Sequence, residues 1–70
     1  MTLQEFCAVF HDSFQPVRVL ELSGKDIKSR HNVRAHARIA EHVPAELLSC
    51  TVVSVVQFYG GVSIAGEKED

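Results

Sequence analysis

The sequence lacks any long apolar stretch. Its 70 residues contain no run of about 18 apolar residues, the shortest that can form a transmembrane helix. The opening stretch MTLQEFCAVF lacks the basic region and the small-residue cleavage site of a signal peptide. Hydrophobic residues make up 46% of the chain, which is typical of a globular protein and argues against disorder. We therefore predict one small domain in the cytoplasm, with no membrane association.

Cysteine is scarce as well, with only Cys7 and Cys50 present. Because the chain has no export signal, we expect two packed free thiols and no disulfide.

Recognisable catalytic groupings are absent too. His11, Asp12 and Ser13 are the residue types of a hydrolase triad, but consecutive side chains point apart and cannot form one. The sequence therefore predicts a protein that is not an enzyme and needs no cofactor.

Three of the four histidines fall within HNVRAHARIAEH, residues 31–42. On a helix, His31 and His42 would share a face but lie about 16 Å apart. On a strand, His36 and His42 would share a face but lie about 20 Å apart. Zinc needs nitrogen ligands about 2 Å from one ion. Neither regular structure gathers such a set locally, and we predict no metal site.

The first half of the chain predicts a helix followed by a strand. Thr2 and Glu5 have the spacing of a capping box, and an apolar stripe predicts a helix over residues 3–11. The stripe consists of Leu3, Phe6, Cys7, Phe10 and Phe14. VRVLEL, residues 17–22, predicts a strand that ends in a turn centred on Gly24. Residues 25–32 fit either a loop or a continuation of the sheet edge.

Residues 33–39 alternate strictly between small apolar and charged or polar side chains. The odd positions, from Val33 to Ile39, are apolar, whereas Arg34, His36 and Arg38 are not. Alternation of this kind is typical of a half-buried strand. Alanine and arginine favour a helix instead. We give the pattern more weight than the propensity and predict a strand here.

The second half of the chain predicts a short helix and a hairpin. VPAELLS should form a helical turn with Pro44 at its first position. CTVVSVVQFY, residues 50–59, predicts a central strand covered on both faces, because both of its faces are apolar. Gly60 and Gly61 supply the hairpin turn, and residues 62–65 form the partner strand. Residues 1–66 form the domain, and residues 67–70 form an acidic frayed tail.

The predicted fold class is therefore α+β, in the order helix, strand, strand, short helix, strand, strand. The N-terminal helix should pack on a mostly antiparallel sheet. One helix cannot easily cover both faces of the strand at residues 50–59. Either the short helix after Pro44 or a second subunit should cover the other face. The second alternative would make the protein a homo-oligomer, such as a homodimer.

Six of the seven lysine and arginine residues lie between Arg18 and Arg38, although the net charge is −2. On a strand, Arg34, His36 and Arg38 would form a basic row about 13 Å long. We interpret this row, together with Tyr59 at the hairpin, as a binding site for a protein partner. The alternative is a nucleic-acid site formed by Lys28, Arg30, Arg34 and Arg38. Basic residues on an edge strand can also serve only to prevent aggregation, and no aromatic residue interleaves with them.

The sequence also has a recurring layout. It consists of an MTLQEF opening helix, a VRVLEL strand closed by SGK, a VPAELLSCTVVSV segment and a final hairpin. This layout resembles small uncharacterised proteins of phages, prophages and other mobile elements in Firmicutes-type bacteria. The resemblance spans most of the chain except the segment of residues 25–36, which is longer and more basic than this layout leads us to expect. It implies a bacterial or phage cytosolic setting and a non-enzymatic role, and it transfers no functional residue.

Overall fold

The structure is a computed structural model that describes residues 1–68. It contains one α-helix, four strands and two short 3₁₀ helices. In chain order these are α1 (Leu3–Val9), β1 (Val17–Ser23), β2 (Asp26–Val33), η1 (Ile39–Glu41), η2 (Ala45–Ser49), β3 (Thr51–Phe58) and β4 (Gly61–Glu67). The predicted α+β order is confirmed, and residues 26–33 take the sheet-edge alternative. No helix among residues 1–68 is long and apolar enough to cross a membrane.

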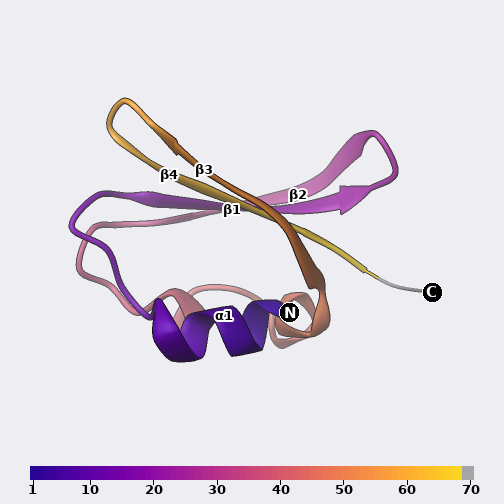
Figure 1. Ribbon diagram of the computed structural model, residues 1–70, viewed down its shortest axis with the longest axis horizontal. Coiled ribbons are helices and arrows are strands. Elements are labelled where there is room, and N and C mark those ends of the chain that lie inside the picture. The colour runs from indigo at the N-terminus through magenta and orange to yellow at the C-terminus, as the bar shows by residue number, and fades with distance from the viewer. Residues whose placement is uncertain (69–70) are drawn as a thin grey trace.

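The four strands form one sheet in the order β2-β1-β4-β3 (Figure 1). β1 pairs antiparallel with β2, and β3 pairs antiparallel with β4. The two hairpins meet through β1 and β4, which are parallel. Parallel strands need a long crossover connection, and the chain between β2 and β3, which carries both 3₁₀ helices, brings β3 and β4 into place. The sheet is mostly antiparallel, as predicted.

α1 and the two 3₁₀ helices pack together on a single face of this sheet (Figure 1). Alternation along β1 directs Val17 and Val19 toward them, and both side chains are buried. The core between these layers is wholly apolar and consists of Leu3, Cys7, Val17, Val19, Val33, Ile39, Val43, Leu47, Cys50 and Ile64. Within residues 1–68, no helix packs on the opposite face of the sheet. We call it the open face; on β1 it carries Arg18, Leu20 and Leu22.

The capping box at the start of α1 is confirmed. The Glu5 N–H donates to the Thr2 hydroxyl at 3.2 Å, and the Thr2 N–H donates to the Glu5 carboxylate at 2.9 Å. The helix ends at Val9, two residues before the predicted end at His11. After Phe10 the chain extends, because the carbonyls of His11 and Ser13 accept hydrogen bonds from residues 39 and 36. The stripe residue Phe14 therefore lies outside the helix and is 88% exposed.

Thr2→Ala should lower the free energy of unfolding by about 1 kcal/mol, since it removes the hydroxyl that accepts from the helix. The Thr2 N–H, and secondarily its hydroxyl, hold the pKa of the Glu5 carboxyl below its ordinary value. A lowered folded-state pKa stabilises the fold at higher pH, and this contribution disappears as the pH falls through that pKa. Urea unfolding at several pH values should show a weaker acid dependence in Glu5→Gln. Gln4→Ala, at an exposed neighbouring position, is the matched control. If Gln4→Ala lowered the free energy of unfolding as much as Thr2→Ala, the capping role of Thr2 would be contradicted.

The predicted strand at residues 33–39 is wrong. β2 ends at Val33, and the chain then turns, with the Ala37 N–H donating to the Arg34 carbonyl at 3.3 Å. His36 has a φ of 66°, a left-handed conformation that breaks any strand. Its N–H donates to the Ser13 carbonyl at 2.8 Å. This contact with a distant segment overrides the alternating pattern.

The predicted central position of the strand at residues 50–59 is also wrong. β3 is an edge strand, with β4 as its one neighbouring strand among residues 1–68, and the central strands are β1 and β4. η2 does not cover the second face of the sheet, because it packs against α1. Pro44 precedes η2 as its N-cap and is not its first residue. Only the second alternative, cover by another subunit, therefore stays a prediction.

The final hairpin turns one residue earlier than predicted. Tyr59 and Gly60 form the turn, Gly60 has a φ of +94°, and Gly61 is already the first residue of β4. β4 runs to Glu67, so its last residue lies in the segment predicted as a frayed tail. Glu69 and Asp70 of that tail lie outside the described residues.

Candidate protein-interaction edge

The predicted basic row does not exist as a strand face. Arg34 lies just after β2, His36 lies in the turn, and Arg38 precedes η1. All three side chains are exposed. The His36 ring contacts the Phe14 ring edge-on, with 5.7 Å between the ring centres. The fold thus leaves these residues accessible but gives them no regular spacing.

The remaining basic candidates lie on β2, at the other edge of the sheet from β3. The Lys28 ammonium is 3.6 Å from the Glu21 carboxylate, which also accepts a hydrogen bond from the Ser29 hydroxyl. Arg30 is exposed and lies opposite Leu20 of β1. Lys28 is therefore partly neutralised, whereas Arg30 is available on the open face.

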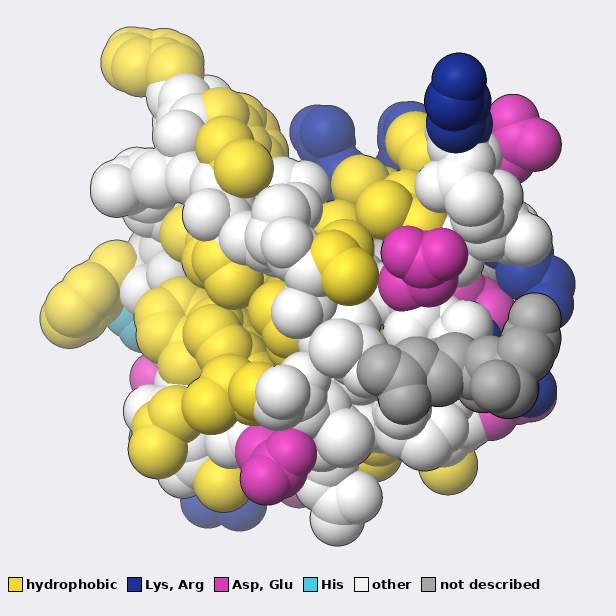
Figure 2. Space-filling model, turned by 45° about the vertical axis from the view of Figure 1, so that its right-hand side comes forward, with side chains coloured by type: hydrophobic (Ala, Val, Ile, Leu, Met, Phe, Trp, Pro, Cys, Tyr) yellow, Lys and Arg dark blue, Asp and Glu magenta, His cyan; other side chains and the backbone are white. Residues whose placement is uncertain are grey.

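β3 carries a concentration of exposed hydrophobic side chains that the sequence analysis placed in the core. The exposed fractions are 49% for Val53, 47% for Val55, 55% for Val56 and 38% for Phe58. Tyr59 follows at the tip of the hairpin and is fully exposed. In the view of Figure 2, hydrophobic side chains run down the left of the molecule from the tip that protrudes at upper left, while most charged side chains lie toward the right. Such contiguous apolar exposure is typical of a binding surface.

β3 also differs from β2 in charge. Natural proteins protect edge strands with charged residues or proline, because an unpaired edge can bind another strand. β2 contains Asp26, Lys28 and Arg30, whereas β3 contains neither a charged residue nor a proline. β3 is therefore the unprotected edge of this sheet.

The first part of the β3 edge is covered by the N-terminus. The Leu3 N–H donates to the Cys50 carbonyl at 2.8 Å, and the Val52 N–H donates to the Met1 carbonyl at 2.9 Å. Residues 1–3 thus act as a short strip of chain beside the start of β3, which accounts for the bridge between Thr2 and Thr51. This cover ends at Val52.

Beyond Val52, the direction of the backbone groups follows from the neighbouring strand. The Val62 N–H of β4 donates to the Pro16 carbonyl at 3.0 Å, so the backbone of Val62 faces β1. Its β3 partner is Gln57. In an antiparallel pair, the backbone N–H and carbonyl groups of two opposed residues point either toward each other or both away from each other. The Gln57 N–H and carbonyl therefore point out of the sheet, and alternation gives the same direction at Val55. We call residues 53–59 the open edge.

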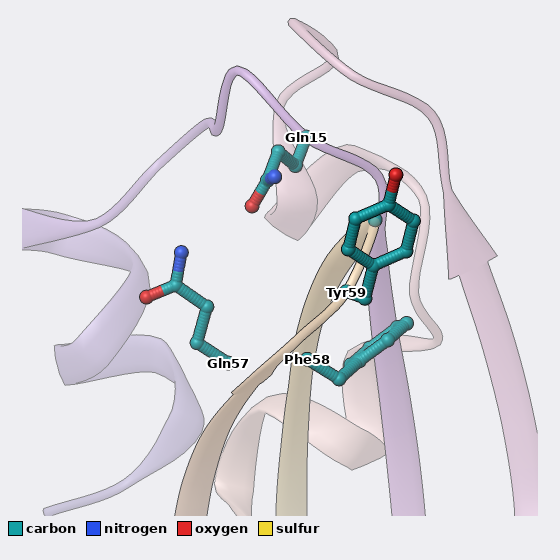
Figure 3. Close-up of a pocket in the computed structure, with 5 residues that line it drawn as sticks. Gln15, Gln57, Phe58 and Tyr59 are labelled. Atoms are coloured by element: carbon teal, nitrogen blue, oxygen red, sulfur yellow. The ribbon is translucent and has the colours of Figure 1, made fainter.

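A shallow hollow lies beside the open edge. Gln15, Gln57, Phe58, Tyr59 and Gly60 line it. Figure 3 shows the Gln15 and Gln57 carboxamides on one side of β3, whereas the Phe58 ring points to the opposite side. Among residues 1–68, neither carboxamide has a hydrogen bond to another side chain or to the backbone. Each can both donate to and accept from an extended peptide laid along β3.

On the open face, Phe58 packs against a basic side chain. The Arg18 guanidinium carbon lies 5.0 Å from the centre of the Phe58 ring. Arg18 is opposite Asn32 of β2 and Ser63 of β4. This contact holds Phe58 at the end of β3 and places a positive charge next to an aromatic ring.

The two cysteines are buried free thiols, as predicted. Burial raises the pKa of the Cys7 thiol and of the Cys50 thiol above the ordinary value. A raised pKa keeps a thiol protonated near neutral pH, and the protonated form is a poor nucleophile. Among the described residues, no group of three or more His, Cys, Asp or Glu side chains is placed to hold a metal ion.

No family model, curated protein or solved structure matches the chain. The candidate site is therefore assigned from the exposure, charge and backbone geometry of this chain alone. Sequence reasoning identified Tyr59 but missed Val55, Val56, Gln57 and Phe58 as surface residues. The available signal was a strand apolar on both faces without a single charge, which fits an exposed binding edge as well as a buried core strand.

Proposed function

We propose that this protein is a small, non-enzymatic interaction domain that binds a polypeptide along the open edge of β3. One observation carries the proposal: an uncharged edge strand exposes hydrophobic side chains from both of its faces, and beyond Val52 its outward-pointing backbone groups have no strand beside them among residues 1–68. A polypeptide that adds a strand to a sheet gains its affinity from backbone hydrogen bonds and its specificity from the alternating side chains. Gln57 and Tyr59 flank the path of the added strand.

The proposed partner-binding residues differ from those of the basic row. Arg34, His36 and Arg38 belong to the segment that returns the chain toward β3, and they would contact only a partner that extends beyond the edge. Tyr59 remains a proposed contact residue because its ring is fully exposed at the hairpin tip. The cytoplasmic setting and the phage or mobile-element origin are proposals that rest on the sequence features alone.

A displayed library of random peptides tests the binding function, with the chain immobilised at low density. We expect enrichment of apolar, extended peptides on the wild-type chain and loss of binding in Val55→Pro. Proline removes only the N–H that points out of the sheet, so the ladder with β4 is retained. Val55→Thr keeps that N–H and is the matched control. Peptides that bind Val55→Pro as well as wild type would show that the backbone of the open edge is not used.

A second candidate function is binding of single-stranded nucleic acid on the open face. The observation that favours it is the Phe58 ring beside Arg18, with Arg30 exposed on the same face. Aromatic rings stack on bases, and arginine side chains neutralise phosphates. This version of the nucleic-acid alternative keeps Arg30 on the open face. Lys28 contacts Glu21 and lies beside Pro44 and Glu46 on the helix-covered side, and Arg34 and Arg38 lie in the crossover connection.

Titration of labelled single-stranded DNA and RNA at low and moderate salt tests this candidate. The expected result is binding that weakens steeply as salt rises and that is reduced by Arg30→Glu. Arg38→Glu is the control, since Arg38 lies outside the sheet. The absence of salt-dependent binding at low salt would remove this function and leave the protein-binding one intact.

A further inference from the structure

We propose that the partner of the open edge is a second copy of this chain, paired antiparallel through β3 about a two-fold axis beside Val56. This inference rests on the proposed function, because it names the polypeptide that the edge binds. The resulting dimer would contain one continuous sheet in the order β2-β1-β4-β3-β3-β4-β1-β2.

The length of the open edge sets the position of the axis. The edge begins after Val52, where the pairing with residues 1–3 ends, and it closes at Tyr59 in the hairpin turn. An antiparallel pair in which both copies use the whole edge must place residue 53 of one copy opposite residue 59 of the other. The midpoint of that register is Val56. The hairpin tip of one copy would then reach, without overlapping, the segment that covers the start of β3 in the other.

The backbone directions suit this register. Val55 and Gln57 both point their N–H and carbonyl out of the sheet, and the register places Val55 of each copy opposite Gln57 of the second copy. Each such pair can exchange two hydrogen bonds, as an antiparallel ladder requires. Val56 faces its own β4, so the two Val56 residues form a non-hydrogen-bonded pair at the axis. Side chains in such a pair approach closely, with the Cα atoms about 4.5 Å apart.

The side chains favour a second copy over a charged partner. Nothing between Thr51 and Phe58 carries a charge, so two copies of the strand meet without like-charge repulsion. At the axis, Val56 contacts Val56, and on the same face Phe58 lies opposite Ser54. The β2 edge is less suited to pairing with a second copy of itself, because Lys28 and Arg30 of one copy would lie close to Lys28 and Arg30 of the other.

A charge exchange at Val56 tests the register. Val56 is 55% exposed in the single chain, so a charged side chain there leaves the fold intact. We expect sedimentation of the wild-type chain to show a dimer. Val56→Lys and Val56→Glu should each weaken the dimer by more than about tenfold, because two like charges then face each other at the axis. An equimolar mixture of the two variants should restore a dimer, now containing one of each.

Controls separate this register from other contacts. Ile27→Lys places a charge on the β2 edge at a position of similar exposure and should leave the dimer unchanged. Circular dichroism verifies that each variant is folded. A dimer that survives Val56→Lys, or a mixture of the two charge variants that stays monomeric, would overturn the proposed register.

A cross-link gives a second, independent measurement. Val56→Cys should form an intermolecular disulfide under mild oxidation, because the Cα atoms of a non-hydrogen-bonded pair lie at a distance that a disulfide spans. The native thiols of Cys7 and Cys50 are buried and should not compete. Ile27→Cys is the control and should remain uncoupled under the same conditions. Equal coupling of the two variants would contradict the proposed pairing.

The outcomes also distinguish this inference from the proposed function. A wild-type chain that is monomeric at high concentration but binds displayed peptides in a manner sensitive to Val55→Pro overturns the dimer and retains the interaction domain. A monomer that also binds no peptide overturns both. A dimer that is lost in Val55→Pro and retained in Val55→Thr supports both.

Discussion

Ile64→Ala should lower the free energy of unfolding by about 2–5 kcal/mol, the usual loss for removing a large buried aliphatic side chain. Ile64 is fully buried on β4, opposite Val19 of β1 and Val55 of β3. The side chain therefore joins the two hairpins under the helical layer. A chain of 70 residues has only a small stability to lose, so we expect a substantial unfolded population at room temperature. Urea denaturation followed by circular dichroism measures the change.

The matched control is Val56→Ala on β3. Val56 is also β-branched and also lies in the sheet, but its side chain is 55% exposed and faces away from the helices. We expect its substitution to change the free energy of unfolding by less than about 1 kcal/mol in the monomer. A similar loss at the two positions would contradict the exposure assigned to Val56, and a larger loss at Val56 than at Ile64 would mean that the buried and open faces of the sheet have been assigned the wrong way round.

The elements that sequence analysis predicted correctly depend on neighbouring residues. Thr2 and Glu5 are three positions apart and form their reciprocal hydrogen bonds within a single helical turn. The turn at Gly24, which has a φ of +62°, joins two strands that pair directly with each other. Because these signals involve short separations along the chain, they do not depend on how the rest of the molecule packs. The α+β class follows from them.

The strand predicted at residues 33–39 failed for the opposite reason. Alternation between Val33 and Ile39 is a local pattern, but the backbone N–H groups of His36 and Ile39 bond to the carbonyls of Ser13 and His11. Those acceptors lie more than twenty residues away in the sequence, and no rule of spacing points to them. Alanine contributes little to a strand, so the pattern had weak intrinsic support against these contacts.

The position of β3 in the sheet depends on strand pairing between segments that lie still farther apart in the sequence, since β4 pairs with β1. Both faces of TVVSVVQF are apolar, which predicts a central strand if every apolar residue is assumed to be buried. The crossover after β2 instead places β4 beside β1 and leaves β3 at the edge. The same lack of charge then acquires a different meaning, because exposed apolar residues on an unprotected edge indicate a binding surface. The residues of the candidate site were therefore visible in the sequence, whereas their exposure was not.

Gly61→Ala should cost about 1–3 kcal/mol of stability, since a methyl group has no room at this position. A Cβ atom on Gly61 would lie 2.7 Å from the Pro16 carbonyl oxygen and 2.9 Å from the end of the Phe58 ring. That carbonyl cannot move freely, because it accepts the Val62 N–H and so joins the start of β4 to the start of β1. We expect thermal unfolding at a lower temperature, together with a change in the NMR signals of Phe58 as its ring leaves Arg18.

A double variant separates the two close contacts of the added methyl group. Phe58→Leu shortens the flexible side chain and relieves only the 2.9 Å contact, whereas the 2.7 Å contact with the Pro16 backbone remains. Gly61→Ala combined with Phe58→Leu should therefore remain less stable than Phe58→Leu alone. Gly24→Ala is the control for the loss of a glycine in a turn, since a Cβ there meets nothing within 4 Å. It should leave the Phe58 signals unchanged. If Phe58→Leu abolished the whole cost of Gly61→Ala, the close approach of β4 to Pro16 would not be what requires glycine at this position.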